Sequence, residues 1–146
     1  MKLSTRGRYG LRAMIGIAQC KDQGPIAIHT IAERQGISER YLEQLMVPLK
    51  RAGLVKSIRG SQGGYILGKS PDKITAGDII RVLEGPIAPV DCVNEINPET
   101  CERAEHCVTR VVWTKIRDSI ADVLDSYSLC DLAQESQNLP EKESFM

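Results

Sequence analysis

The sequence has few of the features that mark membrane and secreted proteins. Its apolar runs all fall short of the ~20 residues that a membrane-spanning helix requires. The segment from Met1 to Arg8 is basic, but it carries no apolar stretch of the kind found in a signal peptide. We therefore expect a cytoplasmic protein without membrane contacts, whose five cysteines do not form a disulfide framework.

Signatures of catalysis are also scarce. The chain contains neither a GxGxxG nor a Walker pattern, and no CxxC pair lies at the start of a helix. Its two histidines are not placed to activate a cysteine, and no paired carboxylates or Ser/His/Asp set suggests hydrolysis. The sequence therefore predicts a protein that is not an enzyme and has no small-molecule substrate. A thiol-based redox enzyme is the distant alternative.

A net charge of zero, from 19 basic and 19 acidic residues, conceals two opposite halves. Residues 1–70 contain 12 Lys and Arg against 4 Asp and Glu, a net charge of +8. Residues 71–146 contain 7 against 15, a net charge of −8. This asymmetry predicts a basic module that binds a polyanion and an acidic module with a separate role.

Apolar periodicity in the basic half predicts three helices and a hairpin. Side chains recur at helical spacing over residues 5–20, 28–35 and 38–53, and Ser38 is a natural N-cap for the third helix. Pro48 predicts a kink or an early end of that helix. Two short strands, over residues 54–58 and 65–67, flank a glycine-rich loop. Residues 1–72 are therefore predicted to form a winged helix-turn-helix domain.

The third helix has the composition of a DNA-recognition helix. Such a helix enters the major groove with its N-terminal residues. Arg40, Glu43 and Gln44 lie opposite its apolar face, and these residue types suit guanine, cytosine and adenine edges. Arg59, at the root of the wing, can reach a minor groove or a phosphate. The remaining basic residues of the predicted phosphate-facing surface are Lys2, Arg6, Arg8 and Arg51.

The acidic half is predicted to contain a linking helix and turn (residues 73–90), a cysteine loop (91–107), a long helix (108–130) and a disordered tail (131–146). The long helix has a clear pattern from Val108 to about Ser126. It spans ~25–30 Å, more than a small winged domain can cover. Its apolar stripe predicts dimerisation with the same helix of a second subunit. The predicted fold is thus mainly α with a small β-hairpin.

Three of the cysteines, Cys92, Cys101 and Cys107, are concentrated in the loop before the long helix. Thiolates select zinc, copper(I) or iron–sulfur clusters. Zinc usually prefers tighter spacings such as C-x2–4-C, so a cluster is favoured among the metals. Unliganded thiols remain the alternative, because no CxxC pair is present.

Four motifs resemble the winged-helix iron–sulfur transcription regulators typified by IscR, with NsrR and CymR as relatives. They are STRGRYGLRAM, IAERQGISERYLEQL, RGSQGGYILGK and AGDIIRVLEGP, and the resemblance covers about residues 1–130. It implies a homodimer with crossed long helices, each subunit reading half of a pseudo-palindromic DNA operator. The predicted DNA-binding residues are Lys2, Arg6, Arg8, Ser38, Arg40, Tyr41, Glu43, Gln44, Arg51, Arg59 and Gly60. The IscR pattern commonly has Ser at the place of Arg40, so the operator sequence cannot be transferred.

The resemblance also implies a [2Fe–2S] cluster bound by Cys92, Cys101 and Cys107. The spacing of the first two is three residues longer than in IscR. The family's histidine ligand is replaced by Arg110, whose guanidinium has no lone pair to offer. His106 and Glu105 are the candidates for the fourth ligand, with Glu102 also in the loop.

Two regulatory functions are therefore open at this point. An IscR-like protein would sense iron–sulfur clusters and control the genes of their biogenesis. The stretch AGDIIRVLEGPIAPV is also very similar to CymR, which lacks the cluster and acts through a partner enzyme of cysteine synthesis. The cysteine trio favours the first alternative.

Overall fold

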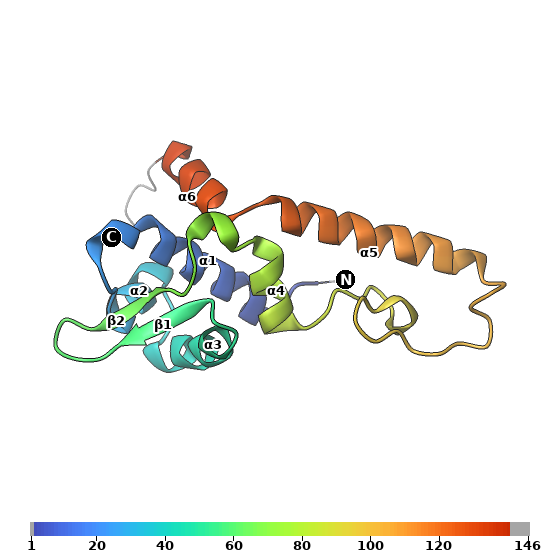
Figure 1. Cartoon of the computed structure of the whole chain (residues 1–146), viewed down its shortest axis with the longest axis horizontal. Coiled ribbons are helices and arrows are strands. Elements are labelled where there is room, and N and C mark those ends of the chain that lie inside the picture. The colour runs from blue at the N-terminus through green and yellow to red at the C-terminus, as the bar shows by residue number, and fades with distance from the viewer. Residues whose placement is uncertain (1, 141–146) are drawn as a thin grey trace.

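The structure is a computed structural model that describes residues 2–140, and it consists of a winged domain with a long projecting helix (Figure 1). The α-helices described are α1 (Thr5–Gln19), α2 (Ile28–Gln35), α3 (Glu39–Arg51), α4 (Ala76–Glu84), α5 (Val108–Ser126) and α6 (Leu129–Asn138). Strands β1 (Val55–Ile58) and β2 (Gly64–Leu67) form an antiparallel hairpin. The predicted fold class, mainly helical with a small hairpin, is confirmed.

The core of the winged domain lies between α1, α3 and α4. Met14, Leu42, Leu45, Leu49 and Ile79 are all 0% exposed. Each belongs to the apolar stripe of its own helix, so burial of these stripes against one another fixes the helix arrangement. None of the helices described is long and apolar enough to cross a membrane.

The turn between α2 and α3 follows from two local signals. Gly36 ends α2 in the left-handed conformation, with φ 67° and ψ 34°, which glycine adopts at little cost. Ser38 Oγ accepts a hydrogen bond of 3.1 Å from the backbone N–H of Tyr41 and so caps α3. Helix α3 does not end at Pro48 but continues to Arg51, because the next residue, Leu49, is anchored in the core.

Close packing of α1 against α4 depends on glycine. A Cβ atom at Gly10 would lie 2.0 Å from Leu83 Cδ1, and one at Gly7 would lie 2.5 Å from Glu84 Oε1. Glu84 Oε1 accepts hydrogen bonds from the backbone N–H groups of Ser4 (2.8 Å) and Gly7 (3.2 Å). The last residue of α4 thus satisfies N–H groups at the start of α1 that have no partner within the helix.

Helix α5 extends away from the winged domain and returns toward it at its C-terminal end (Figure 1). None of the residues of this fully described helix is buried. Val108, Val111, Val112 and Val123 are 78, 55, 51 and 58% exposed. We use the word arm for residues 86–126, that is, α5 and the segment that leads to it.

The prediction of a continuous helix to residue 130 followed by a disordered tail is wrong for residues 127–138. Helix α5 ends at Ser126, and Ser128 and Asp131 form a capping box that starts α6. Leu129 is 0% exposed and joins the core, and Ala133 packs against it. Sequence periodicity missed α6 because the helix is short and polar and is stabilised by contacts with α1. Residues 141–146 of the predicted tail lie outside the described part.

Replacing Leu129 with alanine tests this placement of α6. We expect Leu129→Ala to lower the free energy of unfolding by about 2–5 kcal/mol, the usual cost of a cavity in a core. The control Leu139→Ala removes a side chain that is 66% exposed and should change it by less than ~0.5 kcal/mol. Urea denaturation measures both values, and equal values for the two variants would contradict the packing of α6.

Candidate DNA-binding surface and cysteine loop

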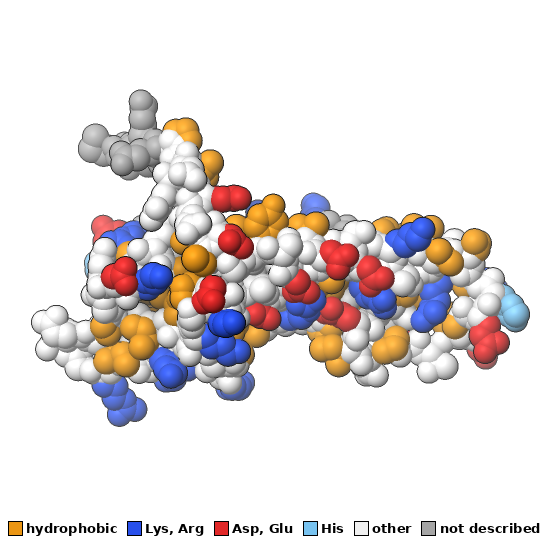
Figure 2. Space-filling model, turned by 45° about the horizontal axis from the view of Figure 1, so that its top comes forward, with side chains coloured by type: hydrophobic (Ala, Val, Ile, Leu, Met, Phe, Trp, Pro, Cys, Tyr) orange, Lys and Arg blue, Asp and Glu red, His pale blue; other side chains and the backbone are white. Residues whose placement is uncertain are grey.

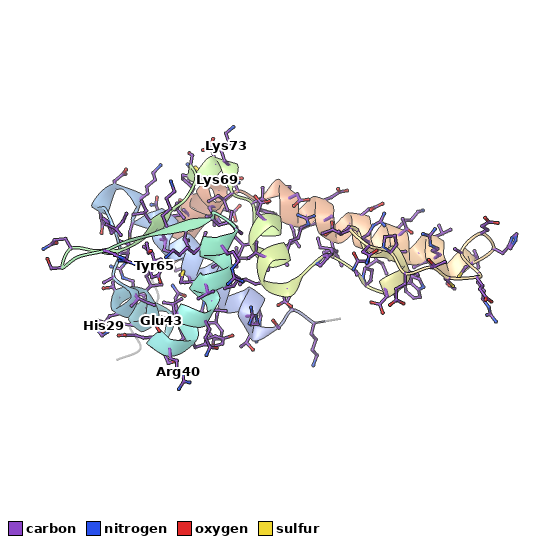
Figure 3. All side chains as sticks on the ribbon, turned by 60° about the horizontal axis from the view of Figure 1, so that its bottom comes forward. His29, Arg40, Glu43, Tyr65, Lys69 and Lys73 are labelled. Carbon is purple, nitrogen blue, oxygen red and sulfur yellow. The ribbon has the colours of Figure 1, made fainter. Side chains whose placement is uncertain are left out.

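Helix α3 presents a polar face to solvent. Its buried stripe, Leu42, Leu45, Met46 and Leu49, turns the opposite side of the helix outward. On that side Arg40, Glu43, Gln44 and Arg51 are all exposed, as is the capping residue Ser38. The structure therefore leaves these predicted DNA-binding side chains accessible at one end of the winged domain, where Figure 3 labels Arg40 and Glu43.

Tyr41 differs from its neighbours because it is half-buried. Its ring packs edge-to-face on Tyr9 of α1, with centroids 6.2 Å apart, and the Arg12 guanidinium lies 5.1 Å from the Tyr9 ring centroid. Tyr41 thus links α3 to α1 through an aromatic contact.

His29 was not among the predicted site residues, yet it lies beside the recognition helix (Figure 3). Its Nδ1 is 2.9 Å from Glu39 Oε1, at the first turn of α3, and its Nε2 is 3.6 Å from Glu33 Oε2. The sequence gives no signal for this contact, because residues 29 and 39 belong to different helices. His29 therefore partners a carboxylate that lies at the N-terminal end of the recognition helix.

The wing is attached to the domain by backbone hydrogen bonds. Tyr65 of β2 exchanges two with Ile26, of 2.8 and 2.9 Å. Gly64 makes this approach possible, because a Cβ atom there would lie 2.2 Å from the Ile26 carbonyl oxygen, and its φ of 155° is unfavourable for other residues. Arg59 and Gly60 are exposed between the strands, as the predicted wing requires.

The start of α1 adds the remaining predicted cations. Lys2, Arg6 and Arg8 are exposed there. Figure 2 shows basic side chains along the lower edge of the winged domain, whereas acidic and basic side chains are mixed on the arm. The lower edge of the winged domain is therefore the part of this face where positive charge gathers.

The three cysteines of the loop do not form a metal-binding group. Cys92 lies in a 3₁₀ turn at Asp91–Val93, Cys101 is exposed, and Cys107 caps the start of α5. Within residues 2–140, no three His, Cys, Asp or Glu side chains are close enough together to bind a metal ion. Cys107 Sγ instead lies 3.0 Å from Thr109 Oγ1, a hydrogen bond that lowers the pKa of the Cys107 thiol.

The predicted fourth ligands do not complete a metal site with the three cysteines. His106 and Glu105 are both exposed in the loop. Arg110, at the place of the family's histidine, is half-buried, and its Nε is the buried side-chain atom without a hydrogen-bond partner in the described part of the chain. A guanidinium has no lone pair to offer a metal, so Arg110 cannot replace the histidine ligand, and the residues present do not fit a cluster in this structure.

Comparison with known proteins identifies the family. The family model of Rrf2, described as an iron-dependent transcriptional regulator, matches residues 3–135. The chain belongs to the Rrf2 family. It is therefore a DNA-binding transcription regulator with a winged helix, and not an enzyme.

Two Rrf2 regulators illustrate the range of relatives. CymR of Bacillus subtilis is 51% identical over 146 residues, covering 100% of this chain and 98% of that protein. The solved structure of CymR, described as the global cysteine regulator of B. subtilis, matches with a TM-score of 0.77 and 53% identity, covering 92% of this chain and 98% of that one. T. potens IscR matches with a TM-score of 0.78 and 44% identity, covering 100% and 96%. Fold similarity alone therefore does not separate the CymR and IscR types.

Removing the Glu84 carboxylate tests how the start of α1 is fixed. Glu84→Ala deprives Ser4 and Gly7 of their acceptor and should lower the free energy of unfolding by about 1 kcal/mol, as the loss of an N-cap does. Hydrogen exchange at the Gly7 amide should accelerate accordingly. Glu84→Gln retains an acceptor oxygen and serves as the matched control. Slow Gly7 exchange in both variants would contradict the capping role.

Proposed function

We propose that this Rrf2 protein is a cluster-free, CymR-like regulator of cysteine metabolism. It would bind pseudo-palindromic operator DNA in the cytoplasm as a homodimer and act with a partner enzyme of cysteine synthesis. The observation that carries the proposal is the cysteine loop, in which the three thiols do not converge and Arg110 replaces a ligand. Identity of 51% to CymR over the whole chain supports it.

DNA binding in this proposal rests on two sets of residues with different roles. Lys2, Arg6 and Arg8 would neutralise phosphates and supply affinity that depends on salt. Arg40, Glu43 and Gln44 would contact base edges, and only these can discriminate sequence. Arg59 in the wing would extend the contact to the neighbouring groove. This division is supported by the exposure of all these side chains.

Dimerisation in this proposal rests on α5. Its 19 residues correspond to a length of about 28 Å, and its valines are more than half exposed. A lone helix in water does not retain such an apolar face without a partner. Pairing α5 with its symmetry mate would bury these side chains and place two recognition helices on one DNA duplex.

An IscR-like function, with a [2Fe–2S] cluster on Cys92, Cys101 and Cys107, is the second candidate. It is favoured by the presence of three cysteines in one loop and by the 44% identity to T. potens IscR. It would require the loop to rearrange so that the thiols meet, with His106, Glu105 or another group as the fourth ligand.

Anaerobic reconstitution with iron and sulfide separates the two candidates. We expect the protein to remain colourless and to retain no stoichiometric iron or sulfide after desalting. A variant with Cys92, Cys101 and Cys107 all replaced by alanine is the baseline. Visible absorption with bound iron and sulfide in the unmodified protein, absent from this variant, would contradict the cluster-free proposal.

Binding to a selected operator tests the two classes of DNA contact. Arg40→Ala should weaken the free energy of operator binding by about 1–3 kcal/mol and reduce the sequence preference at one base pair. Lys2→Ala should weaken binding to all sequences and reduce the steepness of the salt dependence by about one unit. Lys73→Ala also removes one positive charge, but on the side of the winged domain opposite Arg40 (Figure 3). It should leave the operator affinity and its salt dependence unchanged.

The assay is fluorescence anisotropy over a range of salt concentrations. Equal losses for Lys2→Ala and Lys73→Ala would contradict the assignment of the DNA-binding surface. An unchanged base preference for Arg40→Ala would contradict its role in reading the sequence.

A further inference from the structure

Arg81 of α4 forms ion pairs with two carboxylates from different parts of the arm. Its Nε and Nη2 donate hydrogen bonds to Glu95 Oε2 and Oε1, at 2.9 and 3.0 Å. Its Nη1 and Nη2 also donate to Asp125 Oδ1 and Oδ2, at 2.6 and 3.0 Å. Both contacts are bidentate, a geometry that fixes orientation as well as distance. We call these three residues the Arg81 clamp.

The clamp connects the winged domain to two places in the arm, the segment that precedes α5 and the last turn of α5. Asp125 lies in the last turn of α5, and Glu95 lies in the segment that leads to α5. Glu95 also accepts a hydrogen bond of 2.8 Å from the backbone N–H of Ile87, directly after α4. The clamp therefore fixes where the arm leaves the domain and where it returns.

Gly77 makes the return of α5 possible. A Cβ atom at this position would lie 1.9 Å from Asp125 Oδ1 and 2.7 Å from Arg81 Nη1. Backbone hydrogen bonds flank the same point, from Ala76 N–H to the Tyr127 carbonyl (2.9 Å) and from Leu129 N–H to the Ile74 carbonyl (2.8 Å). The end of α5 is thus attached to the winged domain by these two backbone hydrogen bonds and by the clamp.

The charges of the clamp persist at neutral pH. The Arg81 guanidinium lowers the pKa of both the Glu95 and Asp125 carboxyls below their ordinary values. Because the native values are lowered, the stabilisation by the clamp is present above the ordinary carboxyl pKa and is lost as the pH falls through the native value. Glu95 and Arg81 are only 21% and 26% exposed, so solvent screens this pair less than a surface pair.

A small rotation of α5 at the clamp displaces the far end of this helix by several ångströms. Over a helix of about 28 Å, a tilt of about 10° moves the far end by about 5 Å. One DNA base pair corresponds to a rise of about 3.4 Å. An arm that tilted freely by about 10° would therefore not distinguish operators whose half-sites differ in separation by one base pair.

We propose that Arg81 is a positioning residue that, through Glu95 and Asp125, fixes the angle between α5 and the winged domain and thereby sets the half-site spacing that the dimer accepts. The inference rests on the proposed homodimer on paired half-sites. Arg81 lies in the linking helix and does not belong to the recognition surface, so it acts on the placement of α3 and not on base contacts.

The experiment compares variants on operators with altered spacing. The unmodified protein first selects a paired site from randomised DNA, and duplexes are then made with one base pair inserted or deleted between the half-sites. Arg81→Lys retains the charge but cannot bind two carboxylates bidentately. Asp125→Asn retains the shape of the side chain. Asp118→Asn is the matched control, because Asp118 is also on α5 but pairs with its neighbour Arg117.

We expect the unmodified protein and Asp118→Asn to bind about tenfold more weakly when the spacing changes by one base pair, a difference of ~1.4 kcal/mol. In Arg81→Lys and Asp125→Asn this penalty should fall to about twofold, while affinity for a single half-site stays unchanged. Loss of stability alone would weaken all sites equally and leave the tenfold ratio intact. Melting temperatures of all variants show which of them are folded. If Arg81→Lys does not fold, the binding data for Asp125→Asn test the proposal instead.

A tenfold ratio that persists in folded Asp125→Asn overturns the role of the clamp and leaves the proposed function standing. Relaxation in Asp118→Asn to the same extent also overturns it, because the effect would then not be specific to the clamp. If the unmodified protein selects no paired half-sites, the proposed function fails together with the inference.

Discussion

The contacts of α4 are the constraint on which the rest of the molecule depends. One face of this nine-residue helix packs on α1 so closely that Gly10 of α1 has no room for a side chain. The last residue of α4, Glu84, caps α1, and Arg81 binds the arm. The same short helix thus contacts both the start of α1 and the end of α5.

In the proposed complex, different parts of the chain would determine the affinity for DNA, the sequence specificity and the distance between the two recognition helices. In the proposed complex, exposed cations at the start of α1 and polar side chains on α3 would form the DNA-binding surface. The arm contains more acidic than basic residues and an exposed apolar face, which in the proposed dimer would contact a second copy. In the proposed dimer the relation between the two recognition helices is set by α4 and α5, far from any base contact.

The sequence predicts best those elements that bury a periodic apolar stripe, such as α3 with Leu42, Leu45 and Leu49. It does not predict α6, because this helix packs on α1, more than 100 positions earlier in the chain. The sequence does not predict the Arg81 clamp either, because the partners of Arg81 lie 14 and 44 residues away with no common period. The spacing of Cys92, Cys101 and Cys107 predicts a shared site, but spacing cannot show whether a loop brings thiols together.

The proposed winged-helix dimer recognises its operator without a metal centre. The most direct measurement is the affinity and stoichiometry of operator binding by protein purified with a chelator, before and after anaerobic treatment with iron and sulfide. We expect tight binding of two chains per duplex with the same affinity in both states. Sequence-specific binding that arises only after iron and sulfide are supplied would contradict it.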